Sequence, residues 1–240
     1  MTEKINVLGV EFNNATKQQF VDIFEERIIN QEKTFVVTAN PEIVMHANKD
    51  SSYMKTLQQA DFIIPDGIGV VFGSKILKRP ITERVAGFDL MVDLLKVANK
   101  QKLRVFFLGA KEEVVGQAVQ NVEKDYPDLV IAGYHHGFFK QNDRKIVEMV
   151  KGSNADLVFV ALGFTRQENW IIHHLSEFDK GYFMGVGGSF DVLAGTVKRA
   201  PKIWIKLNLE WLYRLLKQPQ RLKRMAFLPL FILKVFKTRK

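Results

Sequence analysis

Cysteine is absent from this chain of 240 residues, and its absence excludes disulfide bonds, thiolate nucleophiles and cysteine-ligated metal sites. Long apolar runs are missing as well. No stretch reaches the roughly 18 consecutive apolar residues that a transmembrane helix needs, and the first residues lack the basic and then apolar layout of a secretory signal. We therefore expect the protein to stay in the cytoplasm, where reducing conditions suit a chain without cysteine.

Patterns that bind metal are equally scarce. No Asp-x-Asp pair occurs in the chain, so a diphosphate-bound Mg²⁺ held by such a pair is not supported. The histidines occur singly at His46 and in the pairs His135-His136 and His173-His174. Adjacent side chains diverge on a helix or a strand, which is poor geometry for one metal. We predict no metal site, and a diphosphate leaving group would then need arginines or helix N-termini to stabilise its charge.

The net charge of +9 is unevenly distributed along the chain. Residues 196–240 contain thirteen Lys or Arg and a single acid, Glu210, which gives this segment a net charge of +12. The first 195 residues therefore carry a charge of −3. A mildly acidic body with a strongly basic tail indicates two parts with different tasks. We predict a catalytic domain at 1–195 and a helical appendage at 196–240.

The first 195 residues alternate short β-branched or aromatic runs with longer segments of helical spacing, as at Phe88–Val97 and Asp143–Val150. This alternation is typical of βαβ units, and strands so continuously apolar are expected to be buried on both faces. We predict an α/β fold with a mostly parallel, Rossmann-like sheet flanked by helices, which should receive ligands at the carboxyl ends of its strands. The expected strands are Thr34–Thr38, Phe62–Ile64, Leu103–Leu108, Leu129–Ala132, Leu157–Ala161 and Tyr182–Val186.

The appendage has the pattern of a basic amphipathic helix that begins at Pro201, and Pro219 is expected to kink or stop it. A second apolar segment, Met225–Leu233, follows a cationic cluster and is too short to span a membrane. We predict that the appendage docks on an anionic membrane surface. The alternative is a basic helix packed on the body as ordinary core. The apolar face consists of Trp204, Leu207, Trp211, Leu212, Leu215 and Leu216.

Polar residues follow two of the predicted strands. Thr38 and Asn40 lie at the end of the first, and Asp66 comes directly after the second. A carboxylate there can accept a proton from an attacking hydroxyl, while Gly67 and Gly69 keep side chains away from a sugar. Asn40 and Asp66 have a structural alternative, because each is also a good cap for the helix that follows it. These residues alone leave both interpretations open.

Candidates for binding phosphate lie further along the chain. Arg84 can make bidentate contacts to phosphate or sugar oxygens; its alternative is a surface salt bridge with Glu83 or Asp89. Two glycine turns, which begin at Gly163 and Gly185, each follow an apolar strand and open a helix, where backbone N–H groups can bind phosphate. Neither turn matches the P-loop or the six-residue Rossmann pattern, which disfavours kinases and nicotinamide dehydrogenases.

Several short motifs are spaced along nearly the whole chain, and in this order they resemble the WecG/TagA/CpsF glycosyltransferase family. They are Thr38-Ala39-Asn40-Pro41-Glu42, Pro65-Asp66-Gly67-Ile68-Gly69, Arg84-Val85-Ala86-Gly87, Gly163 with Gln167-Glu168, Gly185-Val186-Gly187, Arg199-Ala200-Pro201 and Leu209-Glu210-Trp211-Leu212-Tyr213-Arg214-Leu215. One position departs from the family pattern, because Thr165 stands where the family often has proline. Arg166, Gln167 and Glu168 are kept.

The resemblance implies transfer of N-acetylmannosamine (ManNAc) from UDP-ManNAc to the 4-hydroxyl of N-acetylglucosamine (GlcNAc) on undecaprenyl diphosphate, the linkage unit of wall teichoic acid. The transfer would invert to a β linkage and need no metal or other cofactor. The resemblance also implies that Asp66 is the catalytic base and that Thr38, Arg84 and Gln167 surround the sugar. The residues implied to hold the nucleotide and its diphosphate are Asn40, Asp191, Arg214, Arg221 and Arg224, to which the glycine turn adds Gly185 and Gly187.

The expected partners are a UDP-sugar donor, a polyprenyl-diphosphate-linked GlcNAc acceptor and an anionic membrane surface. The protein would then lie peripherally on the cytoplasmic face of the cell membrane. A homo-oligomer as its resting state is a further alternative. No nucleic acid is expected, because no recognisable motif for one is present. Within the family, a glucosyl or ManNAc-uronic acid donor is the nearest alternative. More distant alternatives are a nucleotide-binding protein without catalysis and a nucleic-acid-binding protein that uses the basic tail.

Overall fold

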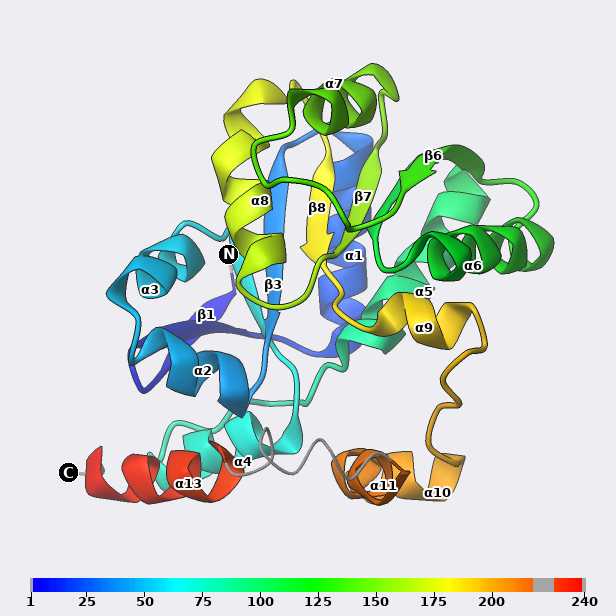
Figure 1. The fold of residues 1–240 in the computed structure, drawn as a ribbon. Helices are drawn as coiled ribbons and strands as arrows, with labels where there is room; N and C mark the ends of the chain where they lie inside the picture. The colour runs from blue at the N-terminus through cyan, green and yellow to red at the C-terminus, as the bar shows by residue number, and fades with distance from the viewer. Residues whose placement is uncertain (1, 218–226, 239–240) are drawn as a thin grey trace.

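The computed structural model describes residues 2–217 and 227–238, and its centre is a parallel sheet in the order β4-β3-β8-β7-β5-β6 (Figure 1). All neighbouring pairs in this sheet are parallel. The predicted α/β fold and each predicted strand are confirmed, with ends that shift by a few residues. The strands are β3 (Thr34–Ala39), β4 (Phe62–Pro65), β5 (Arg104–Gly109), β6 (Val130–His135), β7 (Leu157–Ala161) and β8 (Tyr182–Gly185).

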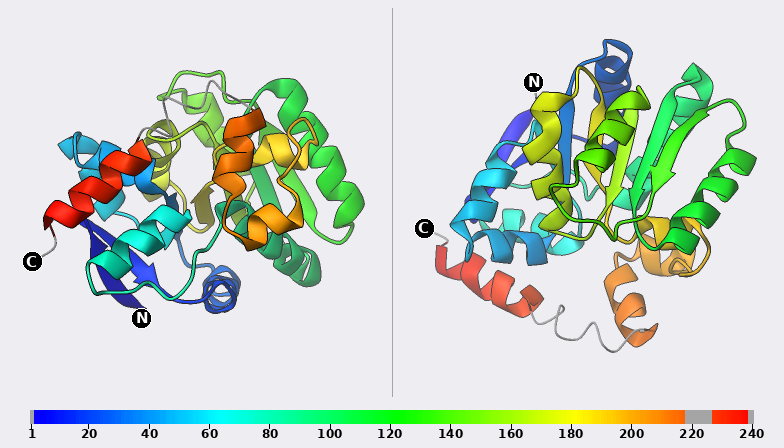
Figure 2. Two further views of the ribbon diagram at one scale, coloured as in Figure 1. Left: turned by 90° about the horizontal axis from the view of Figure 1, so that it is seen from below. Right: turned by 45° about the horizontal axis from the view of Figure 1, so that its top comes forward.

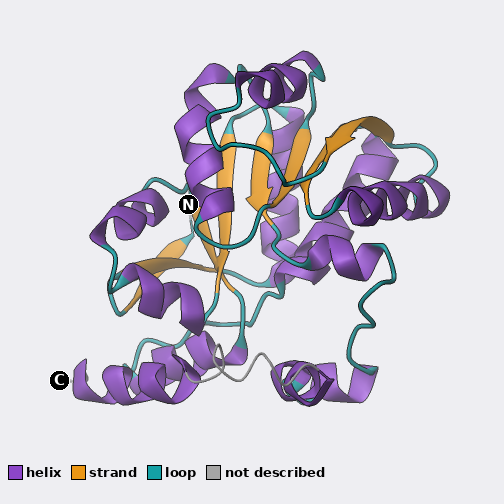
Figure 3. Ribbon diagram, viewed as in Figure 1, coloured by secondary structure: helices purple, strands orange, loops and turns teal. Residues whose placement is uncertain are grey.

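Helices cover both faces of the sheet (Figure 3), which explains why its central strands are continuously apolar; β7 is buried along its whole length. One apolar core joins the sheet to α2 (Pro41–Ala47), α3 (Ser51–Gln58), α7 (Arg144–Gly152) and α8 (Arg166–His174). A second core, on the other face, joins it to α1 (Lys17–Ile29), α5 (Gly87–Gln101), α6 (Glu112–Asp125) and α9 (Ser189–Leu193). The short 3₁₀ helix η1 (Leu175–Glu177) follows α8.

An antiparallel hairpin at the N-terminus was not expected from the sequence. It consists of β1 (Glu3–Val7) and β2 (Val10–Asn14). Leu8 and Gly9 form its two-residue turn, both with positive φ (53° and 86°), as hairpin turns of the primed types require. The hairpin covers the β4 edge of the sheet, where the side-chain oxygen of Asn13 accepts a 2.8 Å hydrogen bond from the Ile63 N–H.

The C-terminal segment is not the continuous helix that was predicted to begin at Pro201. It forms α10 (Lys202–Lys206) and α11 (Glu210–Lys217), and the chain turns between them at Asn208, whose φ is +58°. Pro201 is the N-cap of α10, and α11 ends at Lys217, whereas Pro219 lies outside the described residues. The Trp204 and Tyr213 rings, 5.7 Å apart, pack α10 against α11.

The last helix, α13 (Phe227–Thr238), packs on α2 and on α4 (Ile68–Ile76). Its Phe231 and Val235 are fully buried and belong to the core on the α2 side of the sheet. Figure 2 shows that α4, α10, α11 and α13 lie at the same end of the molecule, beyond the carboxyl ends of the strands. Within residues 2–217 and 227–238, no helix is both long and apolar enough to cross a membrane.

Candidate active site at the carboxyl ends of the strands

Thr38, Asn40 and Asp66 meet at one edge of the sheet. The parallel register of β3 and β4 places Thr38 beside Ile64 and Ala39 beside Pro65. The Asp66 N–H continues this ladder with a 3.0 Å hydrogen bond to the Ala39 carbonyl. The expected juxtaposition of the two strand ends is therefore present in the structure, at the carboxyl end of the sheet, where open α/β sheets usually receive a ligand.

Asp66 does not cap a helix. The N-cap of α4 is Gly67, whose φ of +109° turns the chain sharply and which provides no side-chain cap. The Asp66 side chain is 31% exposed, so its carboxylate can reach a bound molecule.

Gly69 has a different role from the one expected. It is buried, and a Cβ there would lie 2.7 Å from atoms of both Pro41 and Leu228. Gly69 thus admits α2 and α13 to close packing and does not make room for a sugar.

Asn40 caps α2, as its structural alternative proposed. Its side-chain oxygen accepts a 3.0 Å hydrogen bond from the Ile43 N–H, and Pro41 is the first helical residue. The cap fixes Asn40 at the rim of the site, one residue beyond β3. A nucleotide contact by Asn40 stays a prediction.

Arg84 lies between two carboxylates. The neighbouring Val85 N–H donates a 3.0 Å hydrogen bond to the Pro65 carbonyl, which places Arg84 beside Asp66. The Nη2 atom of Arg84 lies 4.0 Å from Oδ1 of Asp66 and 3.1 Å from Oε2 of Glu210, the first residue of α11. The alternative pairing of Arg84 with Glu83 or Asp89 is wrong.

The acids of that alternative have other partners. Glu83 accepts a 3.0 Å hydrogen bond from the Lys17 N–H, and Asp89 forms a 2.7 Å ion pair with Arg199. Arg199 also lies over the Phe88 ring, 5.0 Å from its centroid. These contacts leave Arg84 directed at the candidate site and attach the 196–201 segment to the start of α5.

Gln167 supports the glycine turn that follows β8. Its side-chain oxygen accepts a 3.1 Å hydrogen bond from the Gly187 N–H, and its Nε2 donates a 2.7 Å hydrogen bond to Oε1 of Glu168. The Thr38 hydroxyl donates to the Gly185 carbonyl over 3.3 Å, which links the same turn to β3. Gln167 is only 5% exposed. The structure thus brings Thr38, Gln167, Gly185 and Gly187 together, and a contact of Gln167 with the sugar stays a prediction.

Glu168 is a buried carboxyl that sequence reasoning treated only as part of a motif. It is 1% exposed, and burial raises its pKa above the ordinary value. Burial also raises the pKa of the nearby Tyr53 phenol, and the Glu168 carboxylate adds to that effect. One feature of the sequence could have indicated this burial. Glu168 lies at helical spacing on the apolar face of α8, where Trp170 and Ile171 are also buried.

Two backbone turns approach the site with positive φ. Gly187 has φ +52° and precedes α9, in whose first turn Asp191 is half-buried. Thr165 has φ +67° and precedes α8. Proline, with φ fixed near −65°, cannot adopt this conformation, so the loop has a shape that the proline common in the family does not permit.

The tail arginines are described only in part. Arg214 lies on α11, one helical turn after Glu210. Arg221 and Arg224 lie outside the described residues. In the part of the chain that the structure describes, no three His, Asp or Glu side chains are grouped so as to hold a metal ion.

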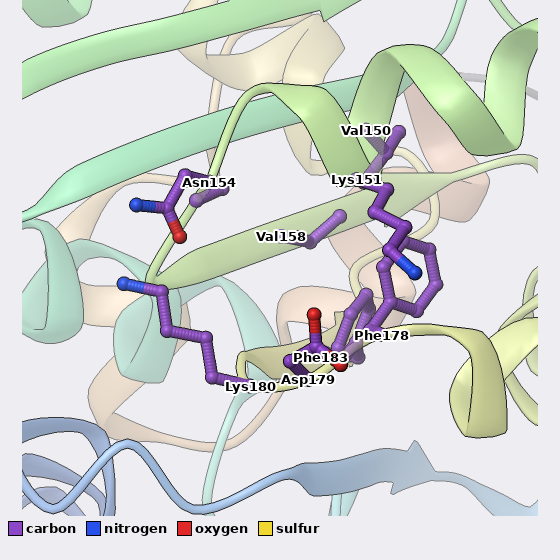
Figure 4. Close-up of a pocket in the computed structure, with 9 residues that line it drawn as sticks. Val150, Lys151, Asn154, Val158, Phe178, Asp179, Lys180 and Phe183 are labelled. Carbon is purple, nitrogen blue, oxygen red and sulfur yellow. The ribbon is translucent and has the colours of Figure 1, made fainter.

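A pocket shown in Figure 4 lies at the amino ends of the central strands β7 and β8. Val158 and Phe183, near the amino ends of β7 and β8, form its floor, and Lys151 and Lys180 lie at its rim. Lys180 is already paired with Asp156 at 2.6 Å. None of the predicted site residues lines this pocket.

Comparison with known proteins agrees with this arrangement. Residues 5–240 match the model of the glycosyl transferase WecG/TagA/CpsF family. The chain belongs to this family. A protein of Staphylococcus aureus (strain MW2) named N-acetylglucosaminyldiphosphoundecaprenol N-acetyl-beta-D-mannosaminyltransferase is 41% identical, over all of this chain and 94% of its own length. A protein of the same name from Bacillus spizizenii is 43% identical, over 98% of this chain and 91% of its own length.

The family membership covers the body and the tail alike, because the match extends from β1 to the last residue. The α10, α11 and α13 segments are therefore part of the glycosyltransferase itself. Glu210, which contacts Arg84, lies within the matched range. The Arg84–Glu210 contact thus joins the candidate site on the body to the tail.

Proposed function

We propose that this chain transfers ManNAc from UDP-ManNAc to the 4-hydroxyl of GlcNAc on undecaprenyl diphosphate, as a step in wall teichoic acid synthesis. Identity of 41–43% over the full chain to the two transferases named above carries this proposal. The carboxylate of Asp66, exposed at the strand edge beside an arginine, supplies the chemistry that such a transfer needs.

In the proposed reaction, the acceptor oxygen attacks the anomeric carbon of ManNAc on the face opposite to UDP. The bond between that carbon and the diphosphate oxygen breaks, and UDP leaves with the electron pair. The hydroxyl proton passes to the carboxylate of Asp66. A single displacement inverts the anomeric centre, so an α-linked donor gives a β-linked product.

The leaving UDP gathers negative charge, and several groups are candidates to stabilise it. Arg84 and the backbone N–H groups of the turn at Gly185 and Gly187 come from the body, and Arg214, Arg221 and Arg224 come from the tail. In the same proposal Thr38 and Gln167 border the sugar, and Asn40 and Asp191 hold the nucleotide. The family implies these roles, and the placement of Thr38, Asn40, Arg84 and Gln167 around Asp66 and the glycine turn supports them.

The end of the molecule that carries the site also suits a membrane surface, where a polyprenyl acceptor resides. Exposed lysines at positions 202, 206, 217 and 237 accompany the apolar side chains there. Each basic residue near an anionic leaflet contributes about 1 kcal/mol, and each inserted Leu or Phe about 2 kcal/mol, so half of this set suffices for reversible binding. The exposed apolar residues are Phe72, Ile203, Leu207, Leu216, Leu230, Leu233 and Phe236. In this proposal the enzyme binds peripherally to the membrane, on its cytoplasmic face.

A donor panel tests the proposed function. Purified protein is incubated with a short-chain GlcNAc-diphospho-lipid and, separately, with UDP-ManNAc, UDP-GlcNAc, UDP-glucose and the UDP-ManNAc-uronic acid donor. Release of UDP and product mass are measured for each. We expect turnover with UDP-ManNAc and a product heavier by one N-acetylhexosamine. Turnover restricted to the glucosyl or uronic acid donor would assign a sister specificity and contradict the proposal.

A further inference from the structure

The side-chain amide of Gln167 lies between a hydrogen-bond donor and an acceptor. On one side the Gly187 N–H donates to its oxygen over 3.1 Å, and on the other its Nε2 donates to Oε1 of Glu168 over 2.7 Å. A flipped amide would set Nε2 against the Gly187 donor and its oxygen against the Glu168 oxygen. Both contacts would then be repulsive. Glu168 and Gly187 together therefore select one orientation of the amide.

Glu168 is an unfavourable residue for the place where it lies. Its side chain is 1% exposed, and its Oε2 meets no hydrogen-bond geometry with any described residue. The residues that follow it on α8, Trp170 and Ile171, are buried and apolar. A buried carboxyl is less stable in such surroundings than an apolar side chain of the same size. Departures from good packing chemistry are expected where a residue serves function.

Gln167 connects Glu168 to the backbone of the candidate site. A Cβ at Gly185 would lie 2.5 Å from Nε2 of Gln167, so the amide rests directly on the turn after β8. Gly187 in that turn has a φ of +52°. The Thr38 hydroxyl donates to the Gly185 carbonyl over 3.3 Å. Gln167 thus reaches the turn from α8, and Thr38 reaches it from β3.

We propose that Glu168 is a positioning residue for the donor site. By fixing the Gln167 amide, it holds the backbone at 185–187 in the shape that receives the diphosphate of the UDP-sugar. Because it is almost fully buried, Glu168 acts through Gln167 and does not touch the substrate. Without an acceptor at position 168 the amide can rotate, and the Gly187 N–H loses its partner. The inference rests on the proposed function, because it takes this turn to bind the donor.

The competing explanation is that Glu168 stabilises α8 by its charge. It lies in the first turn of that helix, where a negative charge is favourable. Two substitutions at this one position separate the explanations. Glu168→Gln and Glu168→Met both remove the charge and keep the length of the side chain. Only glutamine keeps an oxygen that can accept from Nε2 of Gln167.

Calorimetric titration with UDP compares the two variants with wild type. We expect Glu168→Gln to bind UDP within about twofold of wild type. Glu168→Met should bind it about 3-fold to 10-fold more weakly, which corresponds to one ordinary hydrogen bond. The methionine variant should unfold near the urea concentration of wild type, because removal of a buried carboxyl offsets the lost bond. Equal UDP affinity of the two variants, whether retained or reduced, would overturn the proposal.

The Gly187 amide proton gives a signature that a role for charge alone does not move. Selective ¹⁵N-glycine labelling restricts the spectrum to the sixteen glycines of the chain, and Gly187→Ala identifies the resonance. It should stay in place in Glu168→Gln and move upfield in Glu168→Met, where the amide proton loses its acceptor. A resonance at the wild-type position in Glu168→Met would overturn the proposal.

A double-mutant cycle shows whether Glu168 acts through Gln167. Gln167→Met removes the amide and should itself weaken UDP binding about 3-fold or more. In that background Glu168→Met should change UDP affinity less than about twofold, because no amide remains to orient. An equal loss in both backgrounds would overturn the proposal. If Glu168→Met does not fold, Gln167→Met still decides, because wild-type UDP binding by it would overturn the proposal.

Failure of the proposed function is recognised separately, because these comparisons use UDP alone. A wild type that binds UDP and does not turn over UDP-ManNAc contradicts the proposed function. The UDP affinities and the Gly187 resonance then decide the role of Glu168 in the same way.

Discussion

Gln167 donates a 2.7 Å hydrogen bond from Nε2 to Oε1 of Glu168, its neighbour on α8. This bond decides which end of the Gln167 amide faces the glycine turn, so that the oxygen accepts from the Gly187 N–H. Glu168 is also almost fully buried, so its ionised form destabilises the folded state. The stability of the protein should therefore depend on pH through this carboxyl group.

Glu168→Gln should change how stability varies with pH. Burial raises the pKa of Glu168 above 4.5. Its protonated form therefore contributes stability that is fully present below the unfolded pKa and is lost as pH rises through the folded pKa. Glutamine keeps an acceptor for Gln167 and does not titrate. Wild type should therefore lose stability relative to the variant as the pH rises above about 4.5. The difference in free energy of unfolding between the two proteins should grow by about 1.4 kcal/mol in total for each unit by which burial raises the pKa of Glu168.

Urea denaturation across pH 4.5 to 8, at constant ionic strength, measures this difference. Parallel stability curves for the two proteins would contradict the prediction. A difference already present at pH 4.5 has no bearing on it, because the amide differs from the carboxyl in more than charge; only the growth of the difference with pH tests the prediction.

Gly185→Ala should damage both stability and transfer. A Cβ at this position would lie 2.5 Å from Nε2 of Gln167, so the Gln167 side chain has to leave its place against the turn. We expect a loss of about 1–3 kcal/mol from overpacking and a fall in transfer rate of about tenfold or more, since small displacements near a reacting centre are costly.

Gly116→Ala is the matched control for that substitution. Gly116 lies within α6, and nothing is within 4 Å of a Cβ placed there. Alanine should stabilise the helix by about 0.5–1 kcal/mol and leave turnover unchanged. Urea denaturation and UDP release measure both variants. Normal transfer by Gly185→Ala would show that the Gln167–Gly187 contact is dispensable.

The body of the fold could be predicted from the sequence because its signals are local. A run such as Leu157–Ala161 is apolar at every position, which is what a strand covered by helices on both faces requires. The hairpin at Glu3–Asn14 gave a weaker signal, since β1 is buried mainly through Ile5 and Val7. The break at Asn208 gave a weak signal, because asparagine adopts the left-handed conformation more readily than most residues but also occurs within helices.

The part of the site that could be predicted is the part that depends on strand order. Thr38, Asn40 and Asp66 follow strands, and parallel strands bring their carboxyl ends to one edge. Glu210 escaped prediction because its contact with Arg84 spans 126 positions and joins two parts of the chain that composition had separated. No local pattern reports such a contact. A single acid in a strongly basic segment is the one feature that could have indicated it.

Phe231→Ala should destabilise the whole protein, although it lies in the tail. Its ring is fully buried, and its Cε1 atom would lie 2.8 Å from a Cβ placed on Gly73 of α4. We expect a loss of about 3–5 kcal/mol in free energy of unfolding. Phe236→Ala, on the same helix but 51% exposed, should cost less than about 1 kcal/mol. Equal losses in urea denaturation would show that α13 does not pack on the body in solution.

Vesicle binding should depend on the exposed face of α13. Replacement of Leu230, Leu233 and Phe236 by serine should reduce flotation with anionic vesicles about tenfold or more, because each side chain contributes about 2 kcal/mol when inserted. These residues are 49–53% exposed, so the fold should persist. The control is Ile29→Ser with Met149→Ser, which alters apolar residues of comparable exposure, 52% and 44%, on α1 and α7. Unchanged flotation of the triple variant would contradict membrane contact through α13.

Asp66→Asn should fold normally and lose at least about 100-fold in transfer rate, within the usual contribution of a general base. Normal folding is expected because Asp66 does not cap α4 and its backbone bond to Ala39 does not involve the side chain. Asp61→Asn, at the other end of β4, is the matched control. The Asp61 carboxylate accepts a 2.7 Å hydrogen bond from the Phe35 N–H, and the asparagine oxygen can still accept it without the charge, so this variant should lose about 1 kcal/mol of stability and keep its turnover. UDP release and thermal unfolding are measured for both. The two substitutions make the same chemical change at the two ends of β4. Wild-type turnover by Asp66→Asn would show that Asp66 is not the catalytic base. Loss of turnover in both variants would show that the defect comes from a disturbed β4.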